Sequence, residues 1–493
     1  MASPYSWLTQ AQAIAALQGR LSNTTSWTSA ECWIYLTEAL RHWSAMSECW
    51  SQDFIVPAAN GAWINTGTAT GSPRLRSVTD TFLYTQMQYM LLEPPTGGTW
   101  TGTTQFDIAS LQLALQKRTQ EVIQAQACNL IQLAPLASTP GTRRTYFPDT
   151  VLEPRRIRFT AVLAQTTATA ANGSQSVIVA SPVGVSTGML VAATGIQPGT
   201  FVASIAGSVL QVSLPPTASL AGTSIQFSQP VTMTREDTQA FQYFEPGFLQ
   251  TIGLPQSWAV SAESPLSFDV VDLAPNTPGS YDVLALTSGP TFAPPATSLL
   301  GVPDDWSWLP LYGAMADVLG RESEATDRAR AEYCLNRYAQ GMDLMLKANW
   351  MKQAAINDIP VDTPSISEMD NYAPKWQASN ANLPTVVQAG IDFVAPTPGI
   401  GQSLSITLVG NAPLLDLSGT YVQVARDDFE AILNYSQHLA AFKYGGAEFA
   451  STMEMLKDFY RAVGERNKRW LTYGIFADVL SGQGQRQEIV VPR

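Results

Sequence analysis

The sequence predicts an α+β fold: a mainly helical bundle core, an inserted small all-β domain of sandwich or barrel type, and extended arms. Apolar residues recur at steps of three and four in two long regions of the chain, which is the period of an amphipathic helix. Between these regions lie short β-like runs separated by Gly, Pro and Asn. Apolar residues make up 45% of the 493-residue chain, which is enough to bury substantial cores.

The N-terminal part, residues 1–158, is predicted to form the first part of the helical core, with one β-hairpin. Thr9 and Gln12 have the spacing of a capping box, so a helix is expected to begin there. The next helix has one continuously apolar face with three tryptophans, for which we favour core packing over stacking on sugars. The hairpin is expected at residues 55–64, and the helices are expected at residues 8–21, 28–50, 79–95 and 106–131.

Residues 159–230 are predicted to form the inserted β domain. The runs SVIVA, GMLVAA, TFVASIA, SVLQVSL and TSIQFS alternate with turn signals such as NG, PG and AG, and there is almost no charge from about residue 160 to 228. Strands at such short and regular spacing are typical of a small sandwich or barrel. Residues 231–300, rich in Pro, Ser and Phe, are predicted to be an extended or β segment that returns to the main body.

Helical periodicity returns in the C-terminal half, interrupted by one arm. Asp304/Asp305 and Asp427/Asp428 stand at helix starts, so we interpret them as caps favoured by the helix macrodipole rather than as glycosidase carboxylates. The predicted parts are a helical hairpin of the core at 301–350, an extended arm with strands at 351–425, C-terminal helices at 426–480 and a flexible tail at 481–493.

The stretch GMLVAATGIQPGTFVASIAG, residues 188–207, has the glycines of a phosphate-binding loop but lacks its other residues. A P-loop needs Lys and then Ser or Thr after its last glycine, whereas here Gly199 is followed by Thr200 and Phe201. A dinucleotide-binding loop would lead into a helix, and no helical pattern follows. We therefore predict a strand, a turn and a second strand.

The chain is acidic and sparsely charged, with a formal net charge of −12 and 14% charged residues. Proteins that grip nucleic acid usually present a basic surface, so the overall charge argues against DNA binding. A low charge content is common in subunits of large assemblies. The arginine-rich residues 143–158 are expected to form ion pairs within the fold or between subunits rather than bind nucleic acid.

Residues that carry catalysis or bind metals are sparse. A metal site would need both His42 and His438 to converge with carboxylates, so we predict no metal and no cofactor. The sequence has neither a nucleophile elbow nor a metalloprotease helix, so we predict that the chain is not an enzyme. None of the four cysteines lies in a C-x-x-C motif, and we expect all of them to be reduced: Cys32, Cys49, Cys128 and Cys334.

The sequence also bears on where the protein is found. The N-terminus does not have the pattern of a secretory signal. No apolar stretch reaches the ~18 residues that span a bilayer. We therefore expect a soluble protein that is made in the cytoplasm.

Two stretches resemble the head–tail connector (adaptor) proteins of tailed bacteriophages, above all those that join the portal to the tail in short-tailed phages. The first is WSQDFIVPAANGAWI, in which an aromatic helix end leads into a hairpin. The second is VPDDWSWLPLYGAMADVLGRESEATDRARAEYCLNRYAQGMDLM, in which a proline-led turn opens a helix of small and aromatic residues and a charged partner helix follows. This resemblance covers the helical half of the chain.

A third stretch, STGMLVAATGIQPGTFVASIAGSVLQVSL, resembles small β modules that recur in phage virion proteins. It has a G-M-x-V start, a G-I-x-x-G-T turn and an S-I-x-G turn. The chain is much longer than the simplest adaptors, in which the β insert and the C-terminal helical part have no counterpart.

The resemblance implies a structural virion protein that forms a ring of twelve copies between portal and tail and lines the DNA exit channel. Its expected partners are further copies, the portal and tail tube, nozzle or fibre proteins; DNA would pass without specific binding, and no membrane is involved. An acidic lumen suits this role because like charge lets DNA slide. Helices at 28–50, 106–131 and 304–347 would build the ring, with the β insert pointing outward. The expected interaction residues are Trp306, Trp308, Tyr312, Arg466, Arg469, Arg486, Ile489, Val490 and Val491.

Two alternatives stay open. One is another phage structural component, such as a baseplate, neck or decoration protein. The other, less favoured, is a carbohydrate-binding tail protein, because such proteins carry a repetitive β-helix or trimeric stem and half of this chain is helical.

Overall fold

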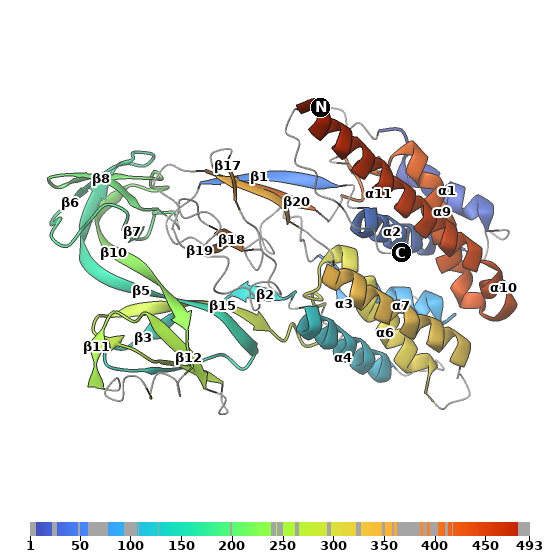
Figure 1. Ribbon diagram of the computed structural model, residues 1–493, viewed down its shortest axis with the longest axis horizontal. Helices are drawn as coiled ribbons and strands as arrows, with labels where there is room; N and C mark the ends of the chain where they lie inside the picture. The colour runs from blue at the N-terminus through green and yellow to red at the C-terminus, as the bar shows by residue number, and fades with distance from the viewer. Residues whose placement is uncertain are drawn as a thin grey trace.

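The computed structural model gives an elongated molecule, with a helical domain at one end and two β lobes at the other (Figure 1). The residues that it describes are 6–21, 27–47, 50–57, 77–92, 106, 108–126, 128–197, 200–237, 243, 250–261, 266–292, 297–321, 327–347, 351–356, 359–361, 385–387, 392–394, 403–409, 413–416 and 418–481.

The helical domain is built around one large hydrophobic core, to which helices from both ends of the chain contribute. Its helices are α1 (Gln10–Arg20), α2 (Ser29–Ser47), α3 (Asp80–Met90), α4 (Ile108–Gln126), α6 (Trp308–Leu319), α7 (Arg328–Lys347), α9 (Arg426–Ala441), α10 (Gly446–Ser451) and α11 (Met453–Ser481), with short 3-10 helices η2 (Asp304–Trp306) and η3 (Phe442–Tyr444).

Local sequence signals fix several helix ends. The Thr9 hydroxyl accepts a hydrogen bond from the Gln12 N–H at 3.2 Å, and the Gln12 side chain accepts one from the Thr9 N–H at 2.9 Å, so the predicted capping box is confirmed. Thr79 caps α3 through the Phe82 N–H at 3.3 Å. Gly445, whose φ is 63°, ends η3, where a left-handed conformation favours glycine.

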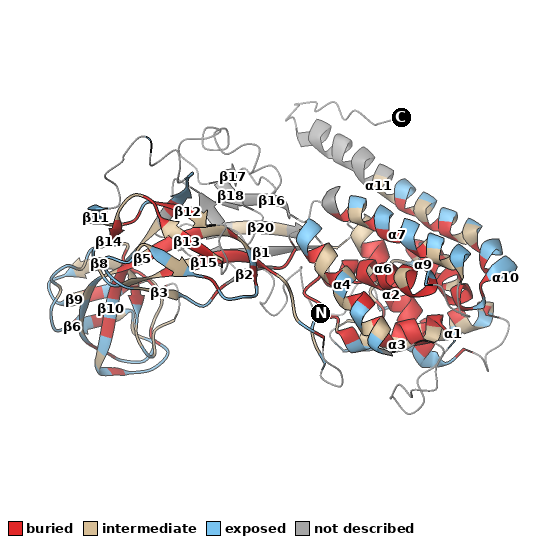
Figure 2. Cartoon of the chain, turned by 90° about the horizontal axis from the view of Figure 1, so that it is seen from below, coloured by how far each residue is buried: buried red, intermediate tan, exposed pale blue. Residues whose placement is uncertain are grey.

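α6 is the central helix of this domain. All of its residues except Asp317 are buried, and it packs between α4 and α7, whereas α4 and α11 keep an exposed outer face (Figure 2). Gly341 of α7 allows close packing here, because a Cβ atom at this position would lie 2.4 Å from Trp308 Cη2.

The β lobes share a mixed sheet that has 12 strands in the described part of the chain. The order along its main path is β4-β13-β12-β10-β5-β6-β9-β8, while β15, β2, β3 and β7 pair beside this path. The strands are β2 (Leu130–Gln132), β3 (Leu136–Ser138), β4 (Arg144–Tyr146), β5 (Val151–Ala170), β6 (Ser176–Val179), β7 (Leu190–Ala192), β8 (Val202–Ala206), β9 (Val209–Val212), β10 (Leu220–Arg235), β12 (Ser257–Ser261), β13 (Ser267–Val270) and β15 (Gly279–Thr287).

Two long strands connect the lobes. β5 has 20 residues and β10 has 16, and they pair antiparallel from Leu220↔Ala170 to Met233↔Ile157. One half of this ribbon packs into an apolar core with β6 to β9, which we call the barrel lobe. The other half packs with β2 to β4, β12, β13 and β15 around a separate core, which we call the second β lobe. A small pair, β11 (Ile252–Gly253) and β14 (Ala274–Pro275), lies beside the second lobe.

The barrel lobe closes on itself. Pairing runs β10-β5-β6-β9-β8, and β7 pairs with β10. The segments of β7 and β8 are joined by backbone hydrogen bonds from Gly188 N to Val202 O (2.8 Å), from Val202 N to Met189 O (2.9 Å) and from Val191 N to Thr200 O (2.8 Å). Closure removes open sheet edges, so this lobe has the form of a small barrel within the 12-stranded sheet.

β15 joins the second β lobe to the helical domain, because its two faces belong to different cores. Val283 and Ala285 pack in the second β lobe, whereas Leu284 and Leu286 pack in the helical core. Side chains of a strand alternate between its faces, so β15 contributes residues to the core of the helical domain and to the core of the second β lobe.

A separate four-stranded sheet has the order β1-β20-β16-β17, with bounds Ser51–Pro57, Ser403–Val409, Met351–Ile356 and Ile359–Val361. β1 pairs antiparallel with β20, more than 340 positions away in the chain, from Ser51↔Val409 to Pro57↔Ser403. The second half of the predicted hairpin at 55–64 lies outside the described residues. β18 (Thr385–Val387) and β19 (Asp392–Val394) form a further pair.

The predicted fold class is wrong, because the β structure is not a small insert in a helical bundle. It forms a large mixed sheet of 12 strands in the described part of the chain, so the fold is a mixed α/β arrangement. Residues 130–158, taken as helical core, contain β2, β3, β4 and the start of β5. Residues 231–300, taken as a returning segment, supply strands to the second β lobe and part of its core.

Candidate functional site

The helical domain encloses a group of charged and aromatic side chains, which we call the buried polar cluster. Tyr333 and Tyr460 in it are partly exposed and its other members are buried. The members come from α2, α6, α7, α9 and α11, and they are Glu38, His42, Trp308, Tyr312, Tyr333, Arg337, Tyr435, His438 and Tyr460.

Glu38 and Arg337 are the charged centre of this cluster, and Tyr435 links them. Arg337 Nη2 donates to the Tyr435 hydroxyl at 2.5 Å, and that hydroxyl donates to Glu38 Oε1 at 3.4 Å. Glu38 also accepts hydrogen bonds from the Tyr312 hydroxyl at 3.0 Å and from Gln86. Burial raises the pKa of Glu38, and the Arg337 charge opposes this shift.

Aromatic rings surround the Arg337 guanidinium. Its carbon lies 5.0 Å from the centroid of Trp308 and 5.6 to 5.7 Å from those of Tyr312, Tyr435 and Tyr460. A cation near ring faces is attracted to their electron density, most strongly where water is excluded. This contact compensates part of the cost of burying the charge.

Both histidines lie in the cluster as hydrogen-bonded, buried rings. His438 contacts the Tyr333 hydroxyl at 2.8 Å and the Thr452 hydroxyl at 2.9 Å. Burial, and then the nearby Arg337 charge, lower the pKa of His438 to about 3. The same two causes hold the pKa of His42 well below its usual range. Neutral imidazoles are therefore part of the folded core at pH 7.

A second buried ion pair lies between Lys443 and Glu31, with Nζ and Oε1 2.9 Å apart. The Lys443 ammonium is 3.3 Å from the ring centroid of Trp27, and Tyr35 donates to the same Glu31 oxygen at 3.1 Å. The buried charges thus have protein partners, as burial of an ion requires. We assign both groups a structural role in joining the N-terminal helices to the C-terminal ones.

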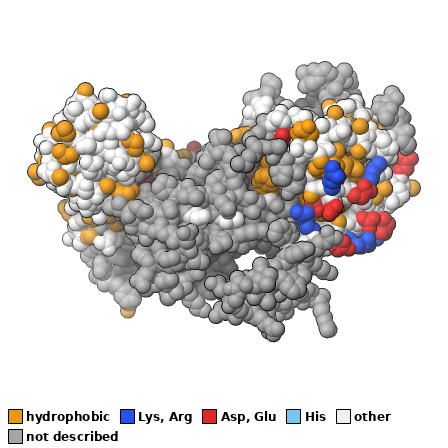
Figure 3. Space-filling model, turned by 90° about the horizontal axis from the view of Figure 1, so that it is seen from above, with side chains coloured by type: hydrophobic (Ala, Val, Ile, Leu, Met, Phe, Trp, Pro, Cys, Tyr) orange, Lys and Arg blue, Asp and Glu red, His pale blue; other side chains and the backbone are white. Residues whose placement is uncertain are grey.

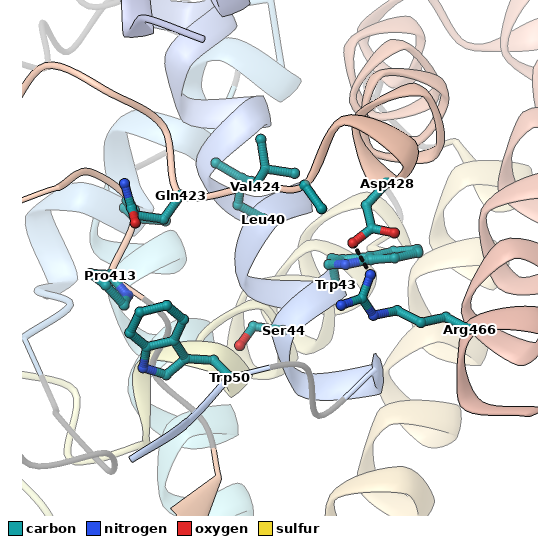
Figure 4. A pocket seen from close by; sticks show the side chains of 11 residues that line it. Leu40, Trp43, Ser44, Trp50, Pro413, Gln423, Val424, Asp428 and Arg466 are labelled. Atoms are coloured by element: carbon teal, nitrogen blue, oxygen red, sulfur yellow. Dashed lines mark hydrogen bonds and ion pairs between the residues drawn. The ribbon is translucent and has the colours of Figure 1, made fainter. Parts of the chain in front are cut away.

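A pocket opens beside the end of α2 (Figure 4). The space that it encloses is about 480 Å³ when the open solvent at its mouth is included. Residues from α2, α9, α11 and the segment before α9 line it: Leu40, Trp43, Ser44, Trp50, Pro413, Leu414, Gln423, Val424, Ala425, Asp428 and Arg466.

One ion pair lies at the edge of this pocket. Arg466 Nη1 donates to Asp428 Oδ2, and its guanidinium carbon lies 6.0 Å from the centroid of the Trp43 ring. Burial raises the pKa of Asp428, while the Arg466 charge opposes that shift. The rest of the lining is mainly apolar, so the pocket has an apolar floor with a neutral ion pair on one side.

The predicted interaction residues do not form one surface in the structure. Arg466 lies at the pocket, as described above. Trp306, Trp308 and Tyr312 do not form an exposed aromatic patch, because they are only 7%, 1% and 1% exposed and belong to the helical core. Trp306 lies in η2, and Trp308 and Tyr312 lie in α6, nearly all of which is buried. The side chain of Arg469 lies outside the described part of the chain, as do Arg486, Ile489, Val490 and Val491.

The comparisons with known proteins leave the family open. No protein-family model matches the chain, and no curated protein matches it.

The described residues were also searched for metal and membrane sites. Among them, His, Cys, Asp and Glu side chains do not gather in groups of three or more that could hold a metal ion. The helices of the described part lack the combination of length and hydropathy that crossing a membrane requires.

Arginines of the stretch 143–158 form ion pairs with carboxylates of the same chain, which is one of the two arrangements that we predicted. Arg144 and Asp269 form a bidentate pair with both distances 2.8 Å. Arg158 contacts Asp282 at 3.2 Å. These pairs connect neighbouring strands of the second β lobe, so they align the sheet.

Both acidic pairs lie in the first turn of a helix, as predicted, but they do not cap it through side-chain hydrogen bonds. Asp304 instead accepts hydrogen bonds from the N–H groups of Ser77 and Val78, at 2.7 and 2.9 Å, and so fixes the segment before α3. Asp428 pairs with Arg466. Tertiary partners compete with the local cap for each carboxylate.

The sequence reasoning missed the buried polar cluster. One signal was available, since Arg337 stands one turn from Cys334 and next to Tyr338 on an otherwise apolar stripe of α7. A charged residue in that register predicts a buried partner. The partner itself, Glu38, is 299 positions away and could not be identified from spacing.

Proposed function

We propose that the protein is a structural component of a bacteriophage virion and acts as a head-to-tail adaptor. Twelve copies form a ring between the portal and the tail, and DNA passes through the ring without specific binding. The support is the resemblance of two helical stretches to connector proteins and of the barrel lobe to virion β modules, together with the charge distribution described next.

The observation that carries the proposal is the absence of charge in the barrel lobe. From Phe159 to Thr234 the sequence contains no Asp, Glu, Lys, Arg or His. In the described part of the lobe, side chains such as Val183, which is 82% exposed, and Ile178, which is 53% exposed, lie on the surface. Figure 3 shows charged side chains on the helical domain and none on the lobe at the far end.

Such a surface suits burial in an assembly. Charged residues are depleted in the cores of protein interfaces, because an unpaired buried charge is costly. The stretch also has no Trp or Tyr, the rings on which sugars usually stack, so it gives no support to a carbohydrate-binding role. All of the net charge of −12 therefore lies in the remainder of the chain, where it would give the channel its acidic character.

The proposal is tested by electron microscopy of the purified full-length protein, alone and mixed with the portal protein of its phage. Rings with twelve-fold symmetry, seated on the portal, are expected. A monomer that never assembles with the portal would contradict the adaptor role. Density for this chain at a baseplate, neck or capsid surface would replace it with another structural role.

The contribution of the barrel lobe can be tested at one position. Val183→Lys places a charge on the exposed face and is expected to reduce assembly at least tenfold while leaving the melting temperature unchanged, because the side chain contacts solvent in the free chain. Val183→Thr, a neutral change at the same position, is the matched control and should assemble normally. Equal assembly by both variants would place the lobe outside any interface.

The C-terminal segment is the proposed portal-docking element. Deletion of residues 482–493 should abolish docking to the portal without changing the circular dichroism spectrum. Normal docking by the shortened chain would overturn this assignment.

A further inference from the structure

β5 and β10 are the two strands that contribute to the cores of both β lobes, and these cores are separate along them. On β5, Ala161 is the last residue in the core of the second β lobe, and Ala164 is the first that packs against the core of the barrel lobe. On β10, Phe227 belongs to the barrel core, whereas residues 228–231 belong to neither core. The apolar packing is therefore interrupted where one lobe ends and the other begins.

The neighbouring strands change over at the same level. β15 pairs with β5 as far as Ala161, and the Val162 N–H donates to Pro278 O at 3.1 Å. On the other side of the ribbon, β7 pairs with β10 up to Ser228, and β12 begins to pair at Thr234. Among the strands that the structure describes, β5 and β10 alone run through both lobes.

A β-bulge interrupts the pairing of β5 with β10 at this level. Val162 and Ala164 pair with consecutive residues of β10, so Leu163 between them is an extra residue in the strand. Its side chain is partly exposed to solvent. A bulge disrupts the ladder locally and bends the strand that carries it. The ribbon is therefore most weakly paired where the two cores end.

Pro230 interrupts the outer edge of β10 beside the bulge. The Thr234 N–H donates to Gln256 O beyond that edge, and Pro230, an even number of positions away in the same strand, turns its nitrogen to the same side. Proline has no N–H to donate to a further strand. A ribbon of two strands also twists more than a wider sheet. The bulge and the proline thus place two interruptions at one point.

The link between the second β lobe and the helical domain is of a different kind. In β15, Val283 and Ala285 are buried in one core and Leu284 and Leu286 in the other. Movement at this link would expose apolar side chains of both cores to water, which is costly. Bending at Leu163 leaves both β cores intact, because it falls between them.

We propose that the barrel lobe swings as one body, relative to the rest of the chain, about a hinge formed by the Leu163 bulge and residues 228–230. A hinge consists of a few residues that absorb a change of backbone angles while the packed bodies on either side stay rigid. The movement changes the angle at which the charge-free surface of the lobe is presented. The inference does not depend on the proposed ring, because it concerns the single chain.

Distances between pairs of spin labels, measured by pulsed electron paramagnetic resonance on the full-length protein, test this inference. The first pair, Ile178→Cys with Tyr146→Cys, spans the ribbon, and the second pair, Tyr146→Cys with Leu113→Cys, spans the β15 link. All three side chains are exposed and lie in regular elements. The chain also carries Cys49→Ser, while the remaining cysteines are buried: Cys32, Cys128 and Cys334.

The distance distribution of the first pair should be at least about twice as broad as that of the second pair, because hinge motion moves one label relative to the other. Distributions of equal width would overturn the inference.

Deletion of Leu163 tests the position of the hinge, because it restores an uninterrupted ladder. The inward side chains of β5 are Phe159 and Ala161 before the bulge and Ala168 and Ala170 after it. These are odd and even positions, so removal of one residue leaves both sets facing their own cores. The distribution of the first pair should narrow to about the width of the second. A distribution that stays as broad as in the undeleted chain would contradict a hinge at Leu163.

Deletion of Gly222 is the matched control. Gly222 is likewise an extra residue, since Ala221 and Thr223 on either side of it pair with consecutive residues of β5, but it lies inside the barrel lobe. The first pair should therefore remain as broad as in the undeleted chain. Equal narrowing in both deletions would overturn the hinge, because the stiffening would not be local to Leu163. If either deletion unfolds the lobe, the two label pairs in the undeleted chain decide the inference.

Discussion

The helical domain and the barrel lobe are stabilised in different ways. The helical domain buries two ionic groups, centred on Arg337 with Glu38 and on Lys443 with Glu31. The barrel lobe is formed by a stretch with no ionisable Asp, Glu, Lys, Arg or His, and its core consists mainly of small and branched apolar residues, together with Met189 and Phe227. One chain thus combines a charge-containing core with a charge-free one.

Because of this difference, we expect the stability of the two parts to respond differently to substitutions and to pH. A buried ion must keep its partner and its protonation state, so the helical domain is sensitive to single substitutions and to pH. The barrel lobe depends on apolar burial and backbone pairing, which do not titrate. We therefore expect changes of charge or pH to alter the stability of the helical domain more than that of the barrel lobe.

The largest expected effect is the loss of Arg337. Arg337→Met leaves Glu38 buried without its compensating charge and removes the hydrogen bond to Tyr435, so the free energy of unfolding should fall by about 3–5 kcal/mol. Urea denaturation followed by tryptophan fluorescence measures it. The control is Arg461→Met, which breaks an exposed pair with Asp458 and should cost less than about 1 kcal/mol. Equal costs for both variants would show that the cluster adds little stability.

Acidification should have an intermediate effect on the free energy of unfolding, because His438 is buried in its neutral form. Its pKa in the folded state is about 3, below the ordinary value near 6.5, so below pH 6.5 the unfolded chain takes up a proton that the folded chain does not. The contribution is complete above about pH 6.5 and is lost as the pH falls toward 3, at about 1.4 kcal/mol per pH unit. By pH 5 this amounts to about 2 kcal/mol.

The His438 contribution is measured by comparing the unfolding free energy at pH 7 and pH 5 in the wild type and in His438→Gln. The variant should be less stable at pH 7 but should lose about 2 kcal/mol less on acidification, because it has no imidazole to protonate. The same pH dependence in both chains would assign it to other groups of the cluster.

The smallest expected effect lies in the barrel lobe. Ile225→Val removes one methyl group from the fully buried core beside β5, which should cost about 0.5–1.5 kcal/mol. The free energy of local opening, from hydrogen exchange of β6 and β9 amides, should fall by this amount equally at pH 7 and pH 5. A cost that changes with pH would show that the lobe is coupled to the charged core.

Much of the local structure follows from the sequence. The capping box at Thr9, the cap at Thr79 and the glycine that ends η3 were all predictable, because each depends on residues a few positions apart. Strands between residues 176 and 212 were predicted for the same reason, since short alternating runs and tight turns specify neighbouring strands. The strand–turn–strand reading of residues 188–207 is confirmed by β7 and β8.

The extent of the β structure was not predictable in this way. β15 pairs with β2, β3 and β5, whose residues lie more than 100 positions earlier, and charged or proline-rich runs hide its partners. In β5 Arg156 and Arg158 alternate with the buried residues Ile157 and Phe159, and Arg158 is itself buried, although the sequence there has the composition of a basic surface segment. Helix α4 was likewise expected to extend too far, because Leu130 and Ile131 continue its apolar pattern but belong to β2.

Local periodicity and composition were enough to predict most of the helices, the capping box at Thr9 and the charge-free stretch from Phe159 to Thr234. The tertiary structure brings Glu38 close to the Arg337 charge, pairs Asp428 with Arg466 and buries Trp308. These outcomes depend on which surfaces exclude water together. Pairing between distant segments is set by the packing of the whole core, so no short window of sequence contains it.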